Sequence, residues 1–162
     1  MKRWRPVVAV LVLVAVVVTA RLTVCDPVRI SSGSMAPTVC TGDVVVIDHL
    51  APRRGLDVGD IVTFPSPVTG AEQIKRVVAV GGQSVAIADA VLQVDGRDVA
   101  EPYVDAASID GVYFGPVTVP GGTVFLMGDD REVSVDSRAY GPVPLGQVDG
   151  RLVATLWSAC PA

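Results

Sequence analysis

Residues 74–80 read IKRVVAV, in which a lysine and an arginine precede a run of small and β-branched apolar residues. Short runs of this kind, bounded by Gly, Pro or Asp, are typical of β-strands. Similar runs lie at residues 43–50, 60–64, 84–88, 91–96, 112–119, 123–128 and 151–157. The pattern predicts a mostly β, antiparallel domain, with a hairpin turn in VDGRDV (94–99) and a loop insertion at 103–111.

The N-terminal segment has a different character. The basic stretch MKRWRP (1–6) precedes residues 7–20, VVAVLVLVAVVVTA, which carry no charge. This run is shorter than the roughly 20 residues that cross a bilayer, but the apolar residues that flank it extend the span, with Arg21 at the interface. We therefore expect 1–25 to be a cytoplasmic basic flank and a single transmembrane anchor. Residues 26–162 then form an extracytoplasmic β-rich domain.

Two other interpretations of the N-terminal segment stay open. A cleaved signal peptide has the same basic start and short apolar core. A lipoprotein signal would end at Cys25, although Val24 is bulky where such signals carry a small residue. No A-x-A site ends the apolar run, which favours the retained anchor.

The charge and the cysteine content of the outer domain limit the classes of function that it can have. The chain has 13 Lys+Arg and 17 Asp+Glu, and residues 1–21 hold four of the basic residues and no acidic one. The remainder therefore has 9 basic against 17 acidic residues, a net charge of −8, which argues against nucleic-acid binding. The spacing of Cys25, Cys40 and Cys160 matches no metal motif. One disulfide is allowed in an outward-facing domain, and the sequence does not choose the pair.

Lys75 is the only lysine outside the N-terminal flank, in a chain that otherwise uses arginine for positive charge. A buried lysine can lose its proton and act as a general base, whereas arginine cannot. The single histidine, His49, has no matching partners nearby in the sequence, so a Ser-His-Asp triad is not indicated. A serine nucleophile needs a base, and Lys75 is the candidate for the serines of SSGSM (31–35).

Five ordered motifs resemble those of bacterial type I signal peptidases, which are membrane-anchored serine proteases with a Ser–Lys dyad. They are SSGSMAPTVCTGD (31–43), GDIVTFPSP (59–67), IKRVVAVGG (74–82), VDGRDVAEPYV (94–104) and GDDREVSVDSRAYGPVP (128–144). The resemblance covers nearly the whole chain in the right order. It implies a barrel-like antiparallel β-sheet domain with one N-terminal transmembrane helix.

The resemblance also implies roles for individual residues. Ser34 is expected to be the nucleophile and Lys75 the general base, while the Ser32 hydroxyl and the Ser34 N–H form the oxyanion hole. Ser134 is expected to hydrogen-bond and orient the Lys75 amine. A supporting shell of ion pairs is expected from Arg76, Asp129, Asp136 and Arg138. The pocket for the residue before the cut is expected to be lined by Ile30, Met35 and Ile74.

The sequence departs from the family pattern at several positions. Ser31 stands where proline is usual, Asp130 replaces asparagine, and VGGQ (80–83) replaces a Pro-Gly-Asp turn. None of these changes removes the dyad. Asp130 is expected to favour the ammonium form of Lys75, which opposes its use as a base.

The implied activity is removal of N-terminal signal peptides from exported preproteins at the membrane surface, after small residues of the Ala-X-Ala type. No metal or organic cofactor is expected. The expected partners are preprotein signal peptides and membrane lipid, with no nucleic acid, and the protein is expected to be a monomer. Alternative functions are a processing protease dedicated to one substrate, a self-cleaving Ser–Lys repressor-type protein, and a non-catalytic membrane-anchored β-domain that binds partners.

Overall fold

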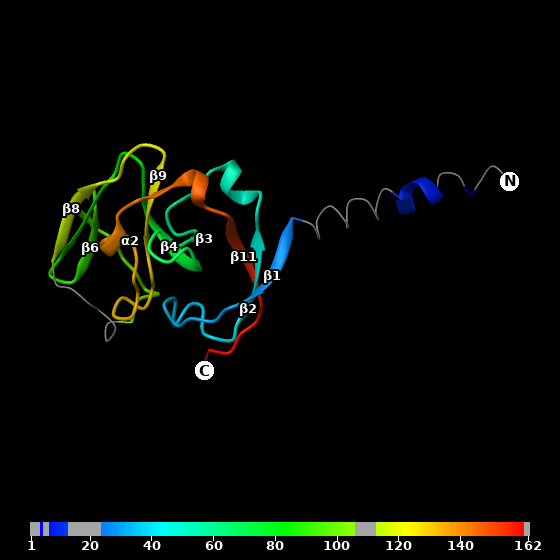
Figure 1. Cartoon of the computed structure of the whole chain (residues 1–162), viewed down its shortest axis with the longest axis horizontal. Coiled ribbons are helices and arrows are strands. Elements are labelled where there is room, and N and C mark those ends of the chain that lie inside the picture. The colour runs from blue at the N-terminus through cyan, green and yellow to red at the C-terminus, as the bar shows by residue number, and fades with distance from the viewer. Residues whose placement is uncertain (1–3, 5–6, 13–23, 106–112, 161–162) are drawn as a thin grey trace.

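The computed structural model describes residues 4, 7–12, 24–105 and 113–160 (Figure 1). Its larger sheet has seven strands, all paired antiparallel, in the order β1-β2-β11-β3-β4-β9-β10. These strands are β1 (Cys25–Arg29), β2 (Val44–Asp48), β3 (Ile61–Pro65), β4 (Glu72–Val80), β9 (Thr123–Met127), β10 (Val143–Pro144) and β11 (Gly150–Trp157). The predicted antiparallel β class is confirmed.

A smaller, four-stranded sheet lies beside the first, in the order β7-β6-β5-β8. Its strands are β5 (Ser84–Ala88), β6 (Val91–Val94), β7 (Arg97–Asp98) and β8 (Phe114–Thr118). The helical elements among the described residues of the domain are single turns: η1 (Ala51–Arg54), α2 (Ser137–Tyr140) and η3 (Leu145–Gln147). The predicted hairpin is confirmed, because Val94 pairs with Arg97 across Asp95 and Gly96, which both have positive φ.

The expected barrel-like closure is wrong. In the described part of the chain β1 and β10 lie at opposite ends of the strand order and do not pair, so the larger sheet is open. Each of these edge strands contains a proline, Pro27 in β1 and Pro144 in β10. Proline cannot donate a backbone hydrogen bond, so it suits an edge and opposes the addition of another strand.

Strand β4 holds the core together, because its residues enter three hydrophobic clusters. Ile74 packs in a cluster with Ile30, Met35, Val39, Val45, Ile47 and Ile61. Val77 packs with apolar residues of β3 and β9, and Val78 with residues of the smaller sheet. The register of β4 against β9 shifts between Val77 and Ala79, and this irregularity lets consecutive residues be buried in different clusters.

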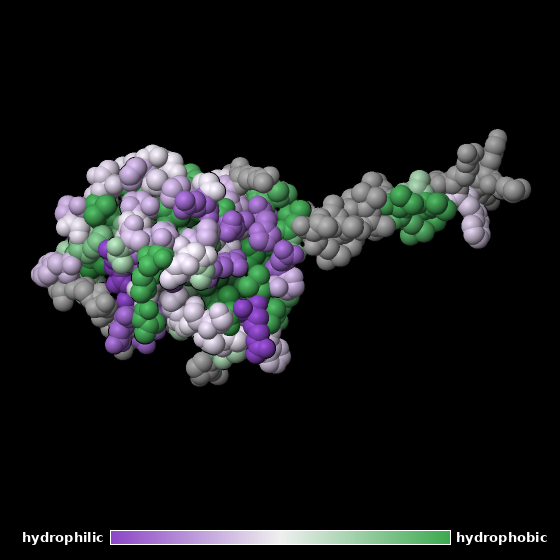
Figure 2. Space-filling view, viewed as in Figure 1, coloured by the Kyte–Doolittle hydropathy of each residue, from purple (hydrophilic) through white to green (hydrophobic). Residues whose placement is uncertain are grey.

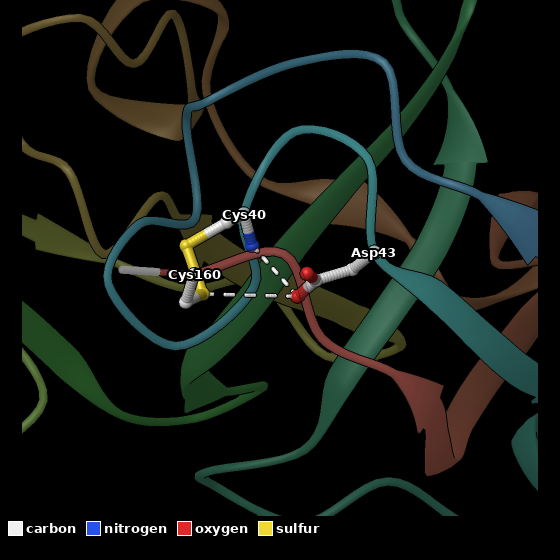
Figure 3. A group of neighbouring side chains, drawn as sticks. All are labelled: Cys40, Asp43 and Cys160. Carbon is white, nitrogen blue, oxygen red and sulfur yellow. Dashed lines mark hydrogen bonds between the residues drawn. A yellow bond between two sulfur atoms is a disulfide. The ribbon is translucent and has the colours of Figure 1, made fainter. Parts of the chain in front are cut away.

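The disulfide joins Cys40 to Cys160, whose Cα atoms are 5.2 Å apart, and Cys25 is not disulfide-bonded. Figure 3 shows the buried Asp43 beside this bridge. Its carboxylate accepts the Cys40 N–H at 2.9 Å and the Ala159 N–H at 2.5 Å. The segment after β11 is therefore fastened to the loop that follows Ser34.

Part of the expected anchor can be described. Residues 7–12 are helical, and their side chains form an exposed apolar surface (green in Figure 2). Among the described residues, no helix has the length and apolar character needed to cross a membrane. Residues 13–23, and with them much of the expected span, lie outside the described residues, as do residues 106–112 of the expected loop insertion.

Candidate active site

Ser34 and Lys75 meet in the larger sheet. Ser34 lies in the turn between β1 and β2, and Lys75 is a central residue of β4. The Lys75 Nζ donates a hydrogen bond of 2.6 Å to the Ser34 Oγ. Both residues are buried, with exposed fractions of 8% for Ser34 and 3% for Lys75. The Asp130 N–H donates to the Ser34 carbonyl oxygen at 3.2 Å, which fixes the turn that carries the hydroxyl.

Burial lowers the pKa of Lys75 from 10.5 to about 8. The nearby carboxylates of Asp136 and Asp129 oppose this shift, and Arg138 adds to it. A lysine with such a pKa is neutral in roughly a tenth of molecules at pH 7 and in half at pH 8. The site therefore provides an amine that can accept a proton near neutral pH.

Asp130 is not among the groups that shift the pKa of Lys75, contrary to the expectation from the sequence. Its carboxylate instead accepts the Val133 N–H at 3.4 Å, within its own turn. The electrostatic role expected of Asp130 belongs to Asp129 and Asp136, which are both 1% exposed.

The four residues expected to form ion pairs do so around Lys75. Arg76 binds both carboxylate oxygens of Asp129, at 2.8 and 2.6 Å, and its guanidinium lies 3.9 Å from the centre of the Tyr103 ring. Arg138 binds both oxygens of Asp136, at 2.9 and 3.0 Å. Bidentate pairs of this kind fix the position of both partners as well as compensating their charges.

The hydrogen bond expected between Ser134 and Lys75 is not formed. The Ser134 Oγ is buried, and the described part of the chain offers it no hydrogen-bond partner. Gly128 explains how close this segment comes to Ser34. A Cβ atom at Gly128 would lie 2.3 Å from the Ser134 Oγ and 2.4 Å from the Ser34 carbonyl oxygen, so only glycine fits.

The residues expected to contact substrate divide into two groups. Ile30, Ser32 and Ile74 line a cavity of about 130 Å³, and the side chain of Ser32 is exposed. Met35 is fully buried and is not among the lining residues of this cavity. It packs in the cluster that supports Ile30 and Ile74 from within, so its expected place in the pocket wall is not observed.

Three further residues complete the buried network but carried no role in the sequence interpretation. Glu101 pairs with Arg131 at 2.5 Å and accepts the Tyr103 hydroxyl at 3.0 Å. The Arg131 Nε also donates to the Gly128 carbonyl oxygen at 3.0 Å. The only signal for these residues was their place in two of the matched motifs, because nothing in the sequence indicates that positions 101 and 131 meet.

Comparisons with known proteins agree with this geometry. The family model described as "Signal peptidase, peptidase S26" matches residues 3–157. A signal peptidase I of Mycobacterium tuberculosis (strain H37Rv) is 35% identical, over 92% of this chain and 71% of that protein. A signal peptidase I of Bacillus caldolyticus is 32% identical, over 96% of this chain and 90% of that protein.

A solved structure is also similar. The crystal structure of a signal peptidase I from Enterococcus faecalis V583 aligns with a TM-score of 0.54 and 32% identity, covering 60% of this chain and 97% of that one. The match therefore extends from sequence to fold. The chain belongs to the signal peptidase family, peptidase S26, and is a serine endopeptidase of that family.

Proposed function

We propose that this protein removes signal peptides from exported preproteins, with Ser34 as nucleophile and Lys75 as general base. The observation that carries the proposal is the 2.6 Å hydrogen bond between the Lys75 Nζ and the Ser34 Oγ, in a site where burial lowers the pKa of the amine. Serine alone is a weak nucleophile, and an adjacent base activates it. The reaction needs no metal or organic cofactor.

The chemistry follows in two steps. Neutral Lys75 accepts the Ser34 proton as the hydroxyl oxygen attacks the scissile carbonyl carbon, and the resulting ammonium protonates the leaving amine when the peptide bond breaks. Water, deprotonated by the regenerated neutral amine, then attacks the acyl-enzyme and releases Ser34. The Lys75 ammonium formed in this step gives its proton to the Ser34 Oγ as the ester bond breaks, so each cycle consumes one water molecule and leaves Lys75 neutral again.

The oxyanion that forms in each step needs hydrogen-bond donors placed before the reaction. We assign this role to the Ser34 N–H and the Ser32 hydroxyl. Ser32 suits the role because it precedes the nucleophile by two residues and lines the same cavity as Ile30 and Ile74.

We assign that cavity to the residue before the cut, which we expect to be small, as in an Ala-X-Ala sequence. Ile30 and Ile74 give the cavity apolar surface beside Ser32, and its volume of about 130 Å³ admits a small side chain. We further propose that residues 1–25 anchor a monomer in the cell membrane with the N-terminus in the cytoplasm. The exposed apolar residues 7–12 and the basic residues before them support this placement.

The test is cleavage-site mapping on a panel of unrelated synthetic signal peptides, with the full chain in detergent. The wild type should cut several of them after a small residue, and Ser34→Ala and Lys75→Ala should cut none. Near-wild-type cleavage by either variant would refute the dyad. Cleavage of a single peptide only would favour a dedicated processing protease. Failure of a serine-reactive acylating inhibitor to label Ser34 would favour a non-catalytic binding protein.

A further inference from the structure

A second cavity borders the candidate site and shares no residue with the one lined by Ile30 and Ile74. It has a volume of about 260 Å³, and its lining residues come from the smaller sheet and from the segment that contains α2. Ile87 of β5 and Phe114 of β8 form its apolar wall, and Ser134 contributes to its polar side. The proposed mechanism does not assign this cavity a role.

The cavity lies against the reacting groups. The Gly128 geometry places the Ser134 Oγ no more than about 4.7 Å from the Ser34 carbonyl oxygen, because a Cβ on Gly128 would lie 2.3 Å from one and 2.4 Å from the other. Asp136 and Arg138, which also line the cavity, are close enough to Lys75 to act on its charge. The cavity therefore adjoins the dyad through Ser134, Asp136 and Arg138, whereas the first cavity adjoins it through Ser32 and Ile74.

The chemistry of the cavity suits an uncharged peptide segment. Tyr113 stands at its rim with 71% of its surface exposed, and its hydroxyl donates to the Asp89 carboxylate, which holds the ring in place. An exposed aromatic residue with a fixed orientation is a common feature of binding surfaces. The cavity also continues along the smaller sheet, because a further hollow of about 420 Å³ shares Ile87, Tyr113 and Phe114.

Two polar groups of the cavity set limits on the ligand. The Ser134 Oγ has no hydrogen-bond partner among the described residues and is itself buried, so it presents no accessible polar atom to a charged group in the cavity. Asp136 and Arg138 already neutralise each other through two hydrogen bonds. A charged side chain placed here would lose its hydration without gaining an ion-pair partner.

We infer that this cavity binds the released side of the substrate, namely the first two residues after the cut, when their side chains are uncharged. This inference rests on the proposed function. A peptide whose preceding residues fill the cavity of Ile30 and Ile74 must continue past Ser34. Its new amino terminus must also stay within reach of Lys75, which protonates it. The cavity beside Ser134 meets both requirements.

The test uses two peptides that are identical up to the cut and carry either Leu-Leu or Glu-Glu directly after it. We expect the wild type in detergent to cleave the leucine peptide with about tenfold higher kcat/KM than the glutamate peptide, in the range that one hydrophobic subsite provides. Tyr113→Ala should reduce this ratio to less than about threefold. Val68→Ala is the matched control, because Val68 is 66% exposed and lines none of these cavities.

The ratio separates this inference from general damage, since a variant that merely impairs the enzyme lowers both rates together. Phe114→Leu, which preserves an apolar residue against the core, provides a second variant and should also lower the ratio. An equal rate for both wild-type substrates, or an unchanged ratio in Tyr113→Ala and Phe114→Leu, would overturn the inference alone. Absence of Ser34-dependent cleavage of either peptide would overturn the proposed function and this inference with it.

Discussion

The two sheets bury different chemistry. The smaller sheet buries apolar residues such as Val85, Ile87 and Leu92, and none of its described charged residues is buried. The larger sheet and its loops bury Lys75 and Arg76, together with carboxylates such as Asp129. Apolar burial stabilises the fold, whereas buried charges oppose folding unless they are paired. The larger sheet therefore combines the proposed reacting groups with the charges that must be compensated, and the smaller sheet acts as an apolar support.

The largest effect should come from Lys75→Arg. Arginine preserves the positive charge but keeps its proton at any accessible pH, so it cannot serve as the base. We expect kcat/KM on a signal peptide to fall by about 10⁴-fold or more, as in other enzymes that lose one member of a catalytic unit. Arg97→Lys, an exposed change on the smaller sheet, is the control and should leave the rate unchanged. An active Lys75→Arg enzyme would mean that only the charge matters.

The second prediction pairs Asp129→Asn in the larger sheet with Leu92→Ala in the smaller one. Asp129→Asn leaves the buried Arg76 without its counter-charge and should reduce the free energy of unfolding by about 3–5 kcal/mol. Leu92→Ala should reduce it by about 2–5 kcal/mol through a cavity. Chemical denaturation measures both.

Only the first of these variants should change the pH profile. The Asp129 carboxylate raises the pKa of Lys75, so its removal lowers that pKa and moves the acidic limb of kcat/KM to lower pH. Leu92→Ala should lower stability while the limb stays in place. If the acidic limb of kcat/KM shifts in both variants, or in neither, the proposed difference between the two sheets is wrong.

The third prediction concerns Ser32→Ala, with the neighbouring Ser31→Ala as matched control, since both side chains are exposed. Loss of one oxyanion donor should lower kcat by about 10²–10³-fold, or about 2.7–4 kcal/mol. Thermal unfolding should show no change in stability for either variant. Equal rates for Ser31→Ala and Ser32→Ala would place the second donor elsewhere.

The smallest predicted effect is a gain in stability. The pKa of Lys75 is lower in the folded chain, about 8, than in the unfolded chain, 10.5, so the unfolded state binds more protons between these values. The charged Lys75 therefore reduces the free energy of unfolding. This reduction is fully present below pH 8 and disappears as the pH rises to 10.5. Lys75→Met should therefore raise the free energy of unfolding at pH 7 by up to about 3 kcal/mol.

The control for this gain is Arg97→Met on the smaller sheet, which should show no such pH dependence. Unfolding in urea at pH 7 and at pH 10.5 measures the difference for both variants. A Lys75→Met protein that is no more stable than the wild type at pH 7 would contradict the burial cost of the amine.

Much of the strand pattern could be predicted from local sequence, because β-branched runs between turn residues mark strands directly. β1 (Cys25–Arg29) was missed because CDPVR contains proline and aspartate and adjoins the expected anchor. It forms because all five of its residues pair with β2 and Val28 packs on the core. β10 could not be predicted because it has only two residues, Val143 and Pro144, which is too few to show the alternation of apolar and polar residues that marks a strand.

The site was predictable as a set of residues but not as a set of contacts. The motifs identified Ser34, Lys75 and the ion-pair residues, and these do come together. The contacts of Ser134 and Met35 depend on where each side chain points, and the order of the motifs does not determine this. The pairing of Glu101 with Arg131 joins positions 30 residues apart and has no local signal.

The Cys40–Cys160 bridge has a consequence for the survival of the molecule after damage. It closes a covalent ring of the chain with a sequence separation of 120, which contains every strand from β2 to β11. A single cut anywhere inside this ring leaves both pieces attached, so β11 cannot diffuse away from β2 and β3. A protease that nicks one of its own loops would therefore stay assembled, and the nick would become visible only after reduction.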